Sequence, residues 1–398
     1  MSGQSVAGQT SAALDAFVER AAARSTVLAG TGIPTRRVEA WRYTPLRSIT
    51  EIVWKEAAPL DAASAKNLLD KIAYPANGHL FIFGNGREVT SLSSLPENVL
   101  RTDAEAVDPL EDRFSAVLNG ALGRDGLSIR VPKNVDAGLL TLATLHQGSA
   151  ISTHLRHRIV LEEGASLTLF DANVGEGEYL SNPRFDIILA EGARLRHVKH
   201  QSEAENAAHL AIINVEVQGN AEYDSFTLNS GGAVARHEVV TTLAAPHALV
   251  HVNGVQVVNG TRLNDLTSMI HHAAPDCNSR QTVKTVLSDT AQGVFQGKIL
   301  VDRVAQKTDG YQMNQALLLS EKAQINSKPE LEIYADDVKC SHGATVGALD
   351  DEQLFYLRSR GVPEAEARDI LVTAFLTGAL ELVADEALRE LLLRGLFS

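Results

Sequence analysis

Apolar and polar residues alternate along most of the stretch between residues 131 and 347. Successive side chains of a strand point to opposite faces, so this alternation predicts strands. At regular distances a polar corner of three residues interrupts the pattern, a small residue follows, and the alternation resumes. The middle of the chain is therefore predicted to be a series of strands joined by tight corners.

The corners repeat at a fixed period. Segments 159–169, 187–195 and 215–223 share one pattern, in which an alanine recurs every 28 residues, and looser copies follow at 287–291 and 319–325. Strands with corners at a fixed period predict a β-solenoid, because each turn buries its inner face only by stacking on the next turn. A β-sandwich built from hairpins is the alternative.

The two ends of the chain carry helical patterns instead. The N-terminal region, 1–130, is predicted to be mostly helical, with helices at 11–29, 62–72 and 109–122 and a strand at 79–83. The solenoid is assigned to 131–347, and a C-terminal helical region to 348–398. In that region one helix ends before Gly361, a second begins at Pro363 and a third covers 387–396.

The second C-terminal helix has a wide apolar face that includes Ile370, Leu371, Ala374 and Phe375. Such a face is covered by the open end of the solenoid, by a neighbouring helix or by another protein. A cap on the solenoid is the simplest explanation, because such folds require one.

Composition narrows the class of protein. The net charge of −13 argues against a nucleic-acid binder, and no apolar run approaches the length of a membrane span, about 20 residues. The first residues lack the pattern of a secretion signal. Two cysteines among 398 residues cannot form a disulfide framework and fit a cytoplasmic protein.

Cys340 and His342 are the candidate metal ligands. They lie two residues apart at the end of a strand-like run, so they would point to the same face and could offer a sulfur and a nitrogen to one ion. On its own this pair is a weak signal, because a buried cysteine behaves as a small apolar residue. His271 and His272 are adjacent, so on a strand they would face opposite ways.

Signatures of enzymes are mostly missing. Segment 293–299 resembles a phosphate loop, but its glycines are one position too close and Ile299 replaces the Ser or Thr that would hold magnesium. Asp336 and Asp337 could serve a carbohydrate-active enzyme, although neighbouring carboxylates in a turn more often cap backbone amides. Aromatic residues, which a sugar-binding groove would need, make up only 5% of the chain.

Several motifs together resemble a known family. They include Pro-Thr-Arg-Arg-Val-Glu-x-Trp at 34–41, Ser-Lys-Pro-Glu-Leu-Glu-Ile at 327–333 and Ala-Asp-Asp-Val-Lys-Cys-x-His-Gly-Ala-Thr at 335–345. Further matching segments are 275–281, 297–299, 305–308, 314–320 and 354–361. The chain resembles the SufB/SufD family of iron-sulfur cluster assembly proteins, densely from 275 to 375 and more thinly in the middle of the solenoid.

Within that family the chain resembles the SufD branch. SufB-like proteins carry a cysteine on the strand that corresponds to 312–319 and a glutamate directly after the histidine. This chain has Asn314, Gln315 and Ala316 on that strand, and Gly343 follows His342. The resemblance therefore implies that the principal sulfur-accepting cysteine is absent, and Cys277 is interpreted as structural.

The resemblance implies a right-handed parallel β-helix between helical ends and a scaffold role without catalysis. The expected partners are a SufB-like subunit, bound through the β-helix, and a SufC-like ABC-type ATPase, bound through the C-terminal helices and responsible for ATP hydrolysis. Cys340 and His342 would hold iron or an iron-sulfur cluster transiently, shared with the SufB-like subunit, with no permanently bound cofactor. A homodimer of the isolated chain, a purely structural subunit and a carbohydrate-active enzyme stay open as alternatives.

Overall fold

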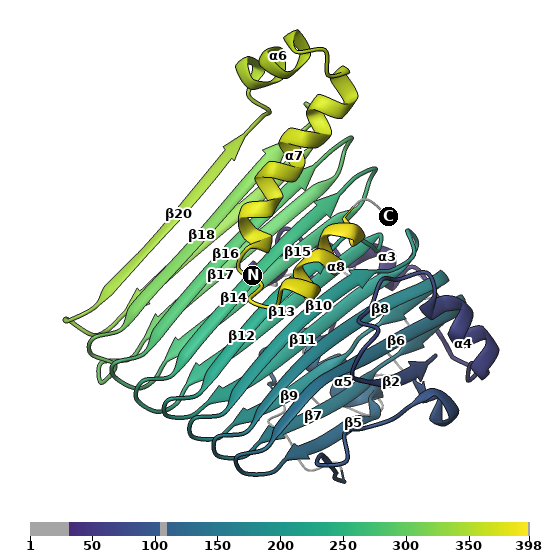
Figure 1. Ribbon diagram of the computed structural model, residues 1–398, viewed down its shortest axis with the longest axis vertical. Coiled ribbons are helices and arrows are strands. Elements are labelled where there is room, and N and C mark those ends of the chain that lie inside the picture. Colours follow the sequence, from purple (N-terminus) through teal and green to yellow (C-terminus); the bar gives the residue numbers. More distant parts are fainter. Residues whose placement is uncertain (1–31, 104–109, 397–398) are drawn as a thin grey trace, which may run out of the picture.

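The fold is a β-solenoid of about eight turns with helices at its two ends, as the computed structural model shows for residues 32–103 and 110–396 (Figure 1). Each turn contributes one strand to each of two parallel sheets. The even sheet contains β6 (Asp136–Thr153), β8 (Ser166–Ser181), β10 (Arg194–Ser202), β12 (Glu222–Asn229), β14 (Leu249–Val258), β16 (Asn278–Leu287), β18 (Asp309–Leu318) and β20 (Lys339–Gly347). The odd sheet contains β5 (Arg124–Val131), β7 (Leu155–Leu161), β9 (Arg184–Leu189), β11 (Ala208–Val217), β13 (Val234–Leu243), β15 (Leu263–His272), β17 (Gln292–Val301) and β19 (Gln324–Ile333). The solenoid prediction is confirmed, and the parallel pairing within each stack excludes the hairpin sandwich.

The corners between odd and even strands explain the repeat. Gly164 and Gly192 have φ values of +67° and +69°. The other corners of this column, up to the one between β17 and β18, also place a residue with positive φ there, namely Asn134, Asn220, His247, Asp276 and Lys307. The last corner, between β19 and β20, has none. The looser copies at 287–291 and 319–325 lie at the opposite edge of the solenoid, where even strands pass to odd strands. The three clear copies of the repeat therefore lie at one edge of the solenoid, and the two looser copies lie at the other edge.

The core lies between the two sheets and beneath the helices. Inward aliphatic residues such as Leu169, Ile187 and Val215 fill the space between the sheets. A second cluster covers the outer face of the even sheet, where α4 (Ala62–Leu69), α7 (Glu364–Leu380) and α8 (Glu386–Gly395) pack. In Figure 1, α7 and α8 lie across the strands of the even sheet, and α6 (Asp351–Ser359) projects beyond their ends.

The N-terminal region contributes strands as well as helices. β2 (His79–Gly84) extends the even sheet by pairing with β6, and β1 (Lys55–Glu56), β3 (Arg87–Glu88) and β4 (Leu100–Arg101) are short additions. The remaining elements are η1 (Glu39–Trp41), α3 (Arg47–Thr50), η2 (Thr90–Leu92) and α5 (Phe114–Leu122). The helix predicted at 11–29 lies outside the described residues. α5 begins later than predicted, because Leu110 has a positive φ and Arg113 is extended.

Candidate functional site

The solenoid ends in two strands that are paired on one side only. Among the described residues β20 pairs only with β18, and β19 pairs only with β17. Most residues of β19 are half-buried and most residues of β20 are exposed, in contrast to the buried inner faces of earlier turns. An unpaired strand edge presents free N–H and C=O groups, so this end of the molecule can accept a further strand.

Cys340 lies on β20, opposite Gly310 of β18. Its side chain is half-buried and packs against the core between the sheets. Burial raises the pKa of the thiol, and the carboxylate of Asp309 adds to this effect. Cys340 is therefore a thiol rather than a thiolate at neutral pH, and a metal ion must displace its proton to bind the sulfur.

His342 follows two residues later on β20, opposite Gln312, and is exposed. On a strand its side chain shares a face with that of Cys340, which agrees with the spacing in the sequence. In the part of the chain that the structure describes, no further His, Cys, Asp or Glu completes a three-ligand group around this pair. Any ion held here would take its remaining ligands from another molecule or from water.

The other sulfur and imidazole candidates have structural roles. Cys277 is buried at a corner, where its Sγ donates to the carbonyl oxygen of Ala245 at 3.3 Å, and burial raises the pKa of its thiol. His271 and His272 face opposite ways as expected. His271 pairs with Asp302 at 3.0 Å, whereas His272 is buried against Ser279 and burial lowers its pKa to about 4.

Sequence reasoning missed how the N-terminal segment reaches the same end of the molecule. Residues 39–44 lie on the outer face of the odd sheet, where the guanidinium of buried Arg236 sits 4.1 Å from the centre of the Trp41 ring and donates to the Ala40 carbonyl oxygen at 2.9 Å. Glu39 then pairs with Lys328 of β19 at 2.6 Å. The motif at 34–41 marked this segment in the sequence but did not show where it packs.

The interior of the first turns contains charged side chains that the alternating pattern did not predict. Asp171 and Lys199 form an ion pair of 3.3 Å, and Glu203 lies 2.6 Å from His209 Nδ1, all fully buried. Burial alone would raise the pKa of Asp171, but the positive charge of Lys199 and the nearby imidazole of His197 keep it low. These ion pairs hold the interior side chains of the first turns in place, and in the sequence they lie far from β20.

The C-terminal helices keep part of their apolar surface exposed. α7 buries Leu376 and Leu380 on the even sheet, while Ile370 is 42% exposed. On α6, Phe355 is 74% exposed and Tyr356 is 56% exposed. The hollow beside Ile370 has an acidic rim formed by Glu366, Asp369 and Glu381. The helices therefore cover the even sheet and still leave an apolar surface exposed to solvent.

The cavity near the N-terminal region does not have the lining of a carbohydrate-binding groove. This cavity, of about 390 Å³, contains Glu56 as its only carboxylate and no Phe, Tyr or Trp. Glu56 pairs there with Arg87 and Arg124. Asp336 and Asp337 lie in the corner between β19 and β20, where the Asp337 backbone bonds to Gln306 and Lys307. None of the described helices is both long and apolar enough to cross a membrane.

Comparison with known proteins gives a consistent result. The family described as SUF system FeS cluster assembly, SufBD core domain, matches residues 144–375. Iron-sulfur cluster assembly protein SufD of Escherichia coli is 34% identical over 373 residues, which cover 90% of this chain and 88% of that protein. A SufBD family iron-sulfur cluster assembly protein of Synechocystis is 28% identical over 90% of this chain and 86% of its own length. SufD of Bacillus subtilis is 27% identical over 75% and 69%. The solenoid, its open end and these similarities together show that the chain belongs to the SufB/SufD family of iron-sulfur cluster assembly proteins and is most like SufD.

Proposed function

We propose that this chain is the SufD-type subunit of a scaffold complex that also contains a SufB-like subunit and a SufC-like ABC-type ATPase. The observation that supports it most is the unpaired edge of β20, which carries Cys340 and His342 at the end where a second β-helix could continue the sheet. A SufB-like subunit has the same fold, so it could add a strand to this edge. The same edge would allow two copies of the isolated chain to pair as a homodimer.

The chemistry of the edge suits transient loading. A thiolate and an imidazole are the donors that iron and iron-sulfur clusters accept, and an incomplete ligand set lets the cargo leave. Because burial raises the pKa of Cys340, binding of iron releases a proton and strengthens as the pH rises. In this role the chain supports iron acquisition and cluster formation in the cytoplasm and performs no catalysis itself.

The C-terminal helices supply the proposed ATPase contact. Exposed Ile370 of α7 and exposed Phe355 and Tyr356 of α6 are apolar anchors of the kind that dominate binding energy, and the acidic rim around Ile370 favours a basic partner surface. ATP would then be hydrolysed by the partner. Because α7 and α8 also cover the even sheet, point substitutions test this contact more cleanly than truncation.

A purely structural role is the second candidate function, since Cys340 packs against the core and its thiol is not activated. Co-expression with SufB-like and SufC-like subunits distinguishes the proposals. The scaffold proposal expects the three chains to purify together and the iron content to depend on His342. Recovery of this chain alone would contradict both candidate functions, whereas an intact complex with unchanged iron in His342→Ala would favour the structural role.

A further inference from the structure

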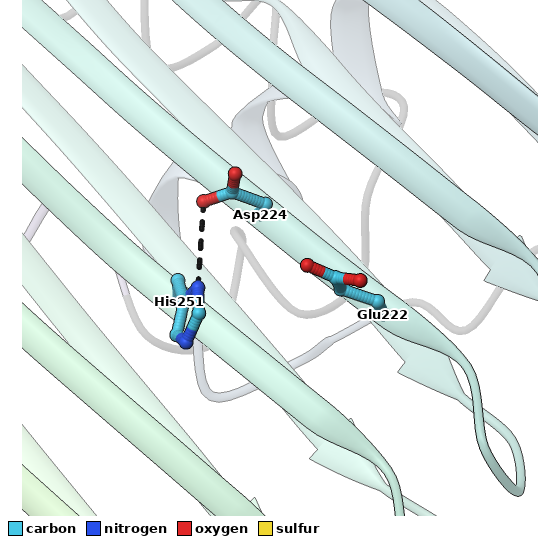
Figure 2. A group of neighbouring side chains, drawn as sticks. All are labelled: Glu222, Asp224 and His251. Atoms are coloured by element: carbon cyan, nitrogen blue, oxygen red, sulfur yellow. Dashed lines mark ion pairs between the residues drawn. The ribbon is translucent and has the colours of Figure 1, made fainter. Parts of the chain in front are cut away.

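Three metal-ligating side chains converge on the outer face of the even sheet. Glu222 and Asp224 are two residues apart on β12, and His251 is the partner of Asp224 on β14. Figure 2 shows the three side chains close together on the two neighbouring strands. Asp224 Oδ1 lies 3.6 Å from His251 Nδ1, and one ligand atom of each residue lies within 4.8 Å of the others. The described residues contain no other group of three such ligands.

These ligand atoms have few other partners among the described residues. The side chains of Glu222, Asp224 and His251 make no hydrogen bond with another described residue, and the nearest cation to Glu222 is the highly exposed Arg194, at 3.9 Å. Arg280, which follows His251 across the sheet, is held by Asp309 at 3.0 Å. Two carboxylates and an imidazole therefore face one another, and their lone pairs are available to bind an ion.

The burial of the group is intermediate. The side chains of His251, Asp224 and Glu222 are 29%, 17% and 34% exposed. An ion can enter from the solvent. The surrounding protein lowers the effective dielectric constant around the ion compared with a flat surface, which strengthens its attraction to the two carboxylates. Asp224 also lines a small hollow beneath the turn between α7 and α8, residues 382–385, so one wall of the site is formed by the C-terminal region.

The donor set selects the kind of ion. One imidazole nitrogen and two carboxylate oxygens suit Zn²⁺, Fe²⁺ or Mn²⁺, with water completing the coordination. Mg²⁺ and Ca²⁺ prefer oxygen ligands throughout, and Cu⁺ prefers sulfur. Metal–ligand bonds of about 2.0–2.2 Å require the three atoms to approach one another slightly more closely, which rotation about side-chain bonds supplies.

We infer that Glu222, Asp224 and His251 form a binding site for one divalent transition-metal ion, separate from Cys340 and His342. The site lies on the outer face of the solenoid, where β14 is three strands and β12 four strands before β20 in the even sheet, and it needs no partner subunit to complete its protein ligands. It gives the isolated chain a metal-binding capacity of its own.

The test uses the full-length chain, stripped of metal, in a Cys340→Ser/His342→Ala background that removes the other candidate ligands. Equilibrium dialysis with Zn²⁺, and anaerobically with Fe²⁺, should give one bound equivalent, and Co²⁺ should give the visible absorption of a bound ion. His251→Ala and Asp224→Asn should each weaken binding at least tenfold, because even the loss of a group that only orients a ligand typically weakens metal binding about 10–100-fold. His271→Ala is the matched control, because that imidazole pairs with Asp302 on the other sheet.

Equal stoichiometry and affinity in the parent, His251→Ala and Asp224→Asn would overturn the inference. Displacement of the ion by millimolar Mg²⁺ would also overturn it, because an ordinary acidic surface without a selective site behaves in that way. Neither result depends on partner subunits, so failure here is distinguishable from failure of the scaffold proposal.

Discussion

Substitution of Gly192 by valine tests the corner column directly. Gly192 has a φ of +69°, and its N–H donates to the carbonyl oxygen of Gly219 in the next turn at 2.9 Å. A Cβ added at this position would meet no atom closer than 3.9 Å, the Cα of Gly164. Space is therefore available, and the cost of the substitution comes from the backbone alone.

The magnitude follows from that backbone conformation. A residue with a side chain pays about 1–2 kcal/mol in the left-handed region, and a β-branched residue pays at the upper end. We expect Gly192→Val to lower the free energy of unfolding by about 2 kcal/mol. Gly192→Asn should cost less than about 1 kcal/mol, because asparagine tolerates this region and occupies the equivalent corner at Asn220 with a φ of +55°.

Urea-induced unfolding of the full chain, followed by circular dichroism, measures both values. Gly347→Val is the matched control, because Gly347 lacks a positive φ and a Cβ there meets nothing within 4 Å. Glu191→Ala, at the exposed residue beside the corner, should also have little effect. Equal unfolding midpoints for Gly192→Val, Gly192→Asn and Gly347→Val would refute the argument that the corner requires a left-handed residue.

Three further predictions concern the interior, the N-terminal segment and the helices. Burial lowers the pKa values of His146 and His157 from 6.5 to about 4. Between these two pH values the unfolded chain binds protons that the native chain does not. The free energy of unfolding should therefore be highest above pH 6.5 and should fall by about 1.4 kcal/mol per pH unit and per histidine toward pH 4. An unchanged urea midpoint between pH 7 and pH 5 would contradict this. Trp41→Ala should cost about 3–5 kcal/mol in unfolding free energy, because the indole is buried against Arg236; a loss below about 1 kcal/mol would mean that the segment is only loosely attached. Ile370→Glu should weaken pull-down of the SufC-like ATPase at least tenfold without changing the melting temperature, whereas Val304→Glu, at a more exposed apolar position away from α7, should leave binding intact.

The solenoid was predictable because its signal is local and repeated. The alternation predicts the strands, and Gly164 and Gly192 indicate the corners. The same corner at His247, Asp276 and Lys307 is hidden, because residues with ordinary side chains adopt the left-handed conformation there under the constraint of the stacked turns. Spacing that varies between turns weakens the repeat further.

Contacts between residues far apart in the chain could not be predicted from the sequence. Arg236 and Trp41 are 195 positions apart, and nothing local to either residue indicates that one stacks on the other. Polar residues at inward positions, such as Asp171 and Lys199, follow the alternation as any inward residue would, so their pairing appears only in three dimensions. The position of Cys340 and His342 on an edge strand likewise depends on where the stacking stops.

The most direct test of the central proposal is the iron and acid-labile sulfide content of the co-expressed complex. Complexes carrying this chain as the parent, as Cys340→Ser/His342→Ala and as His271→Ala are purified without oxygen and reconstituted under identical conditions. The proposal expects all three complexes to keep the same subunit composition, and the double variant alone to lose at least half of its iron and sulfide. Equal iron and sulfide in all three complexes would contradict a ligand role for the open end of the solenoid.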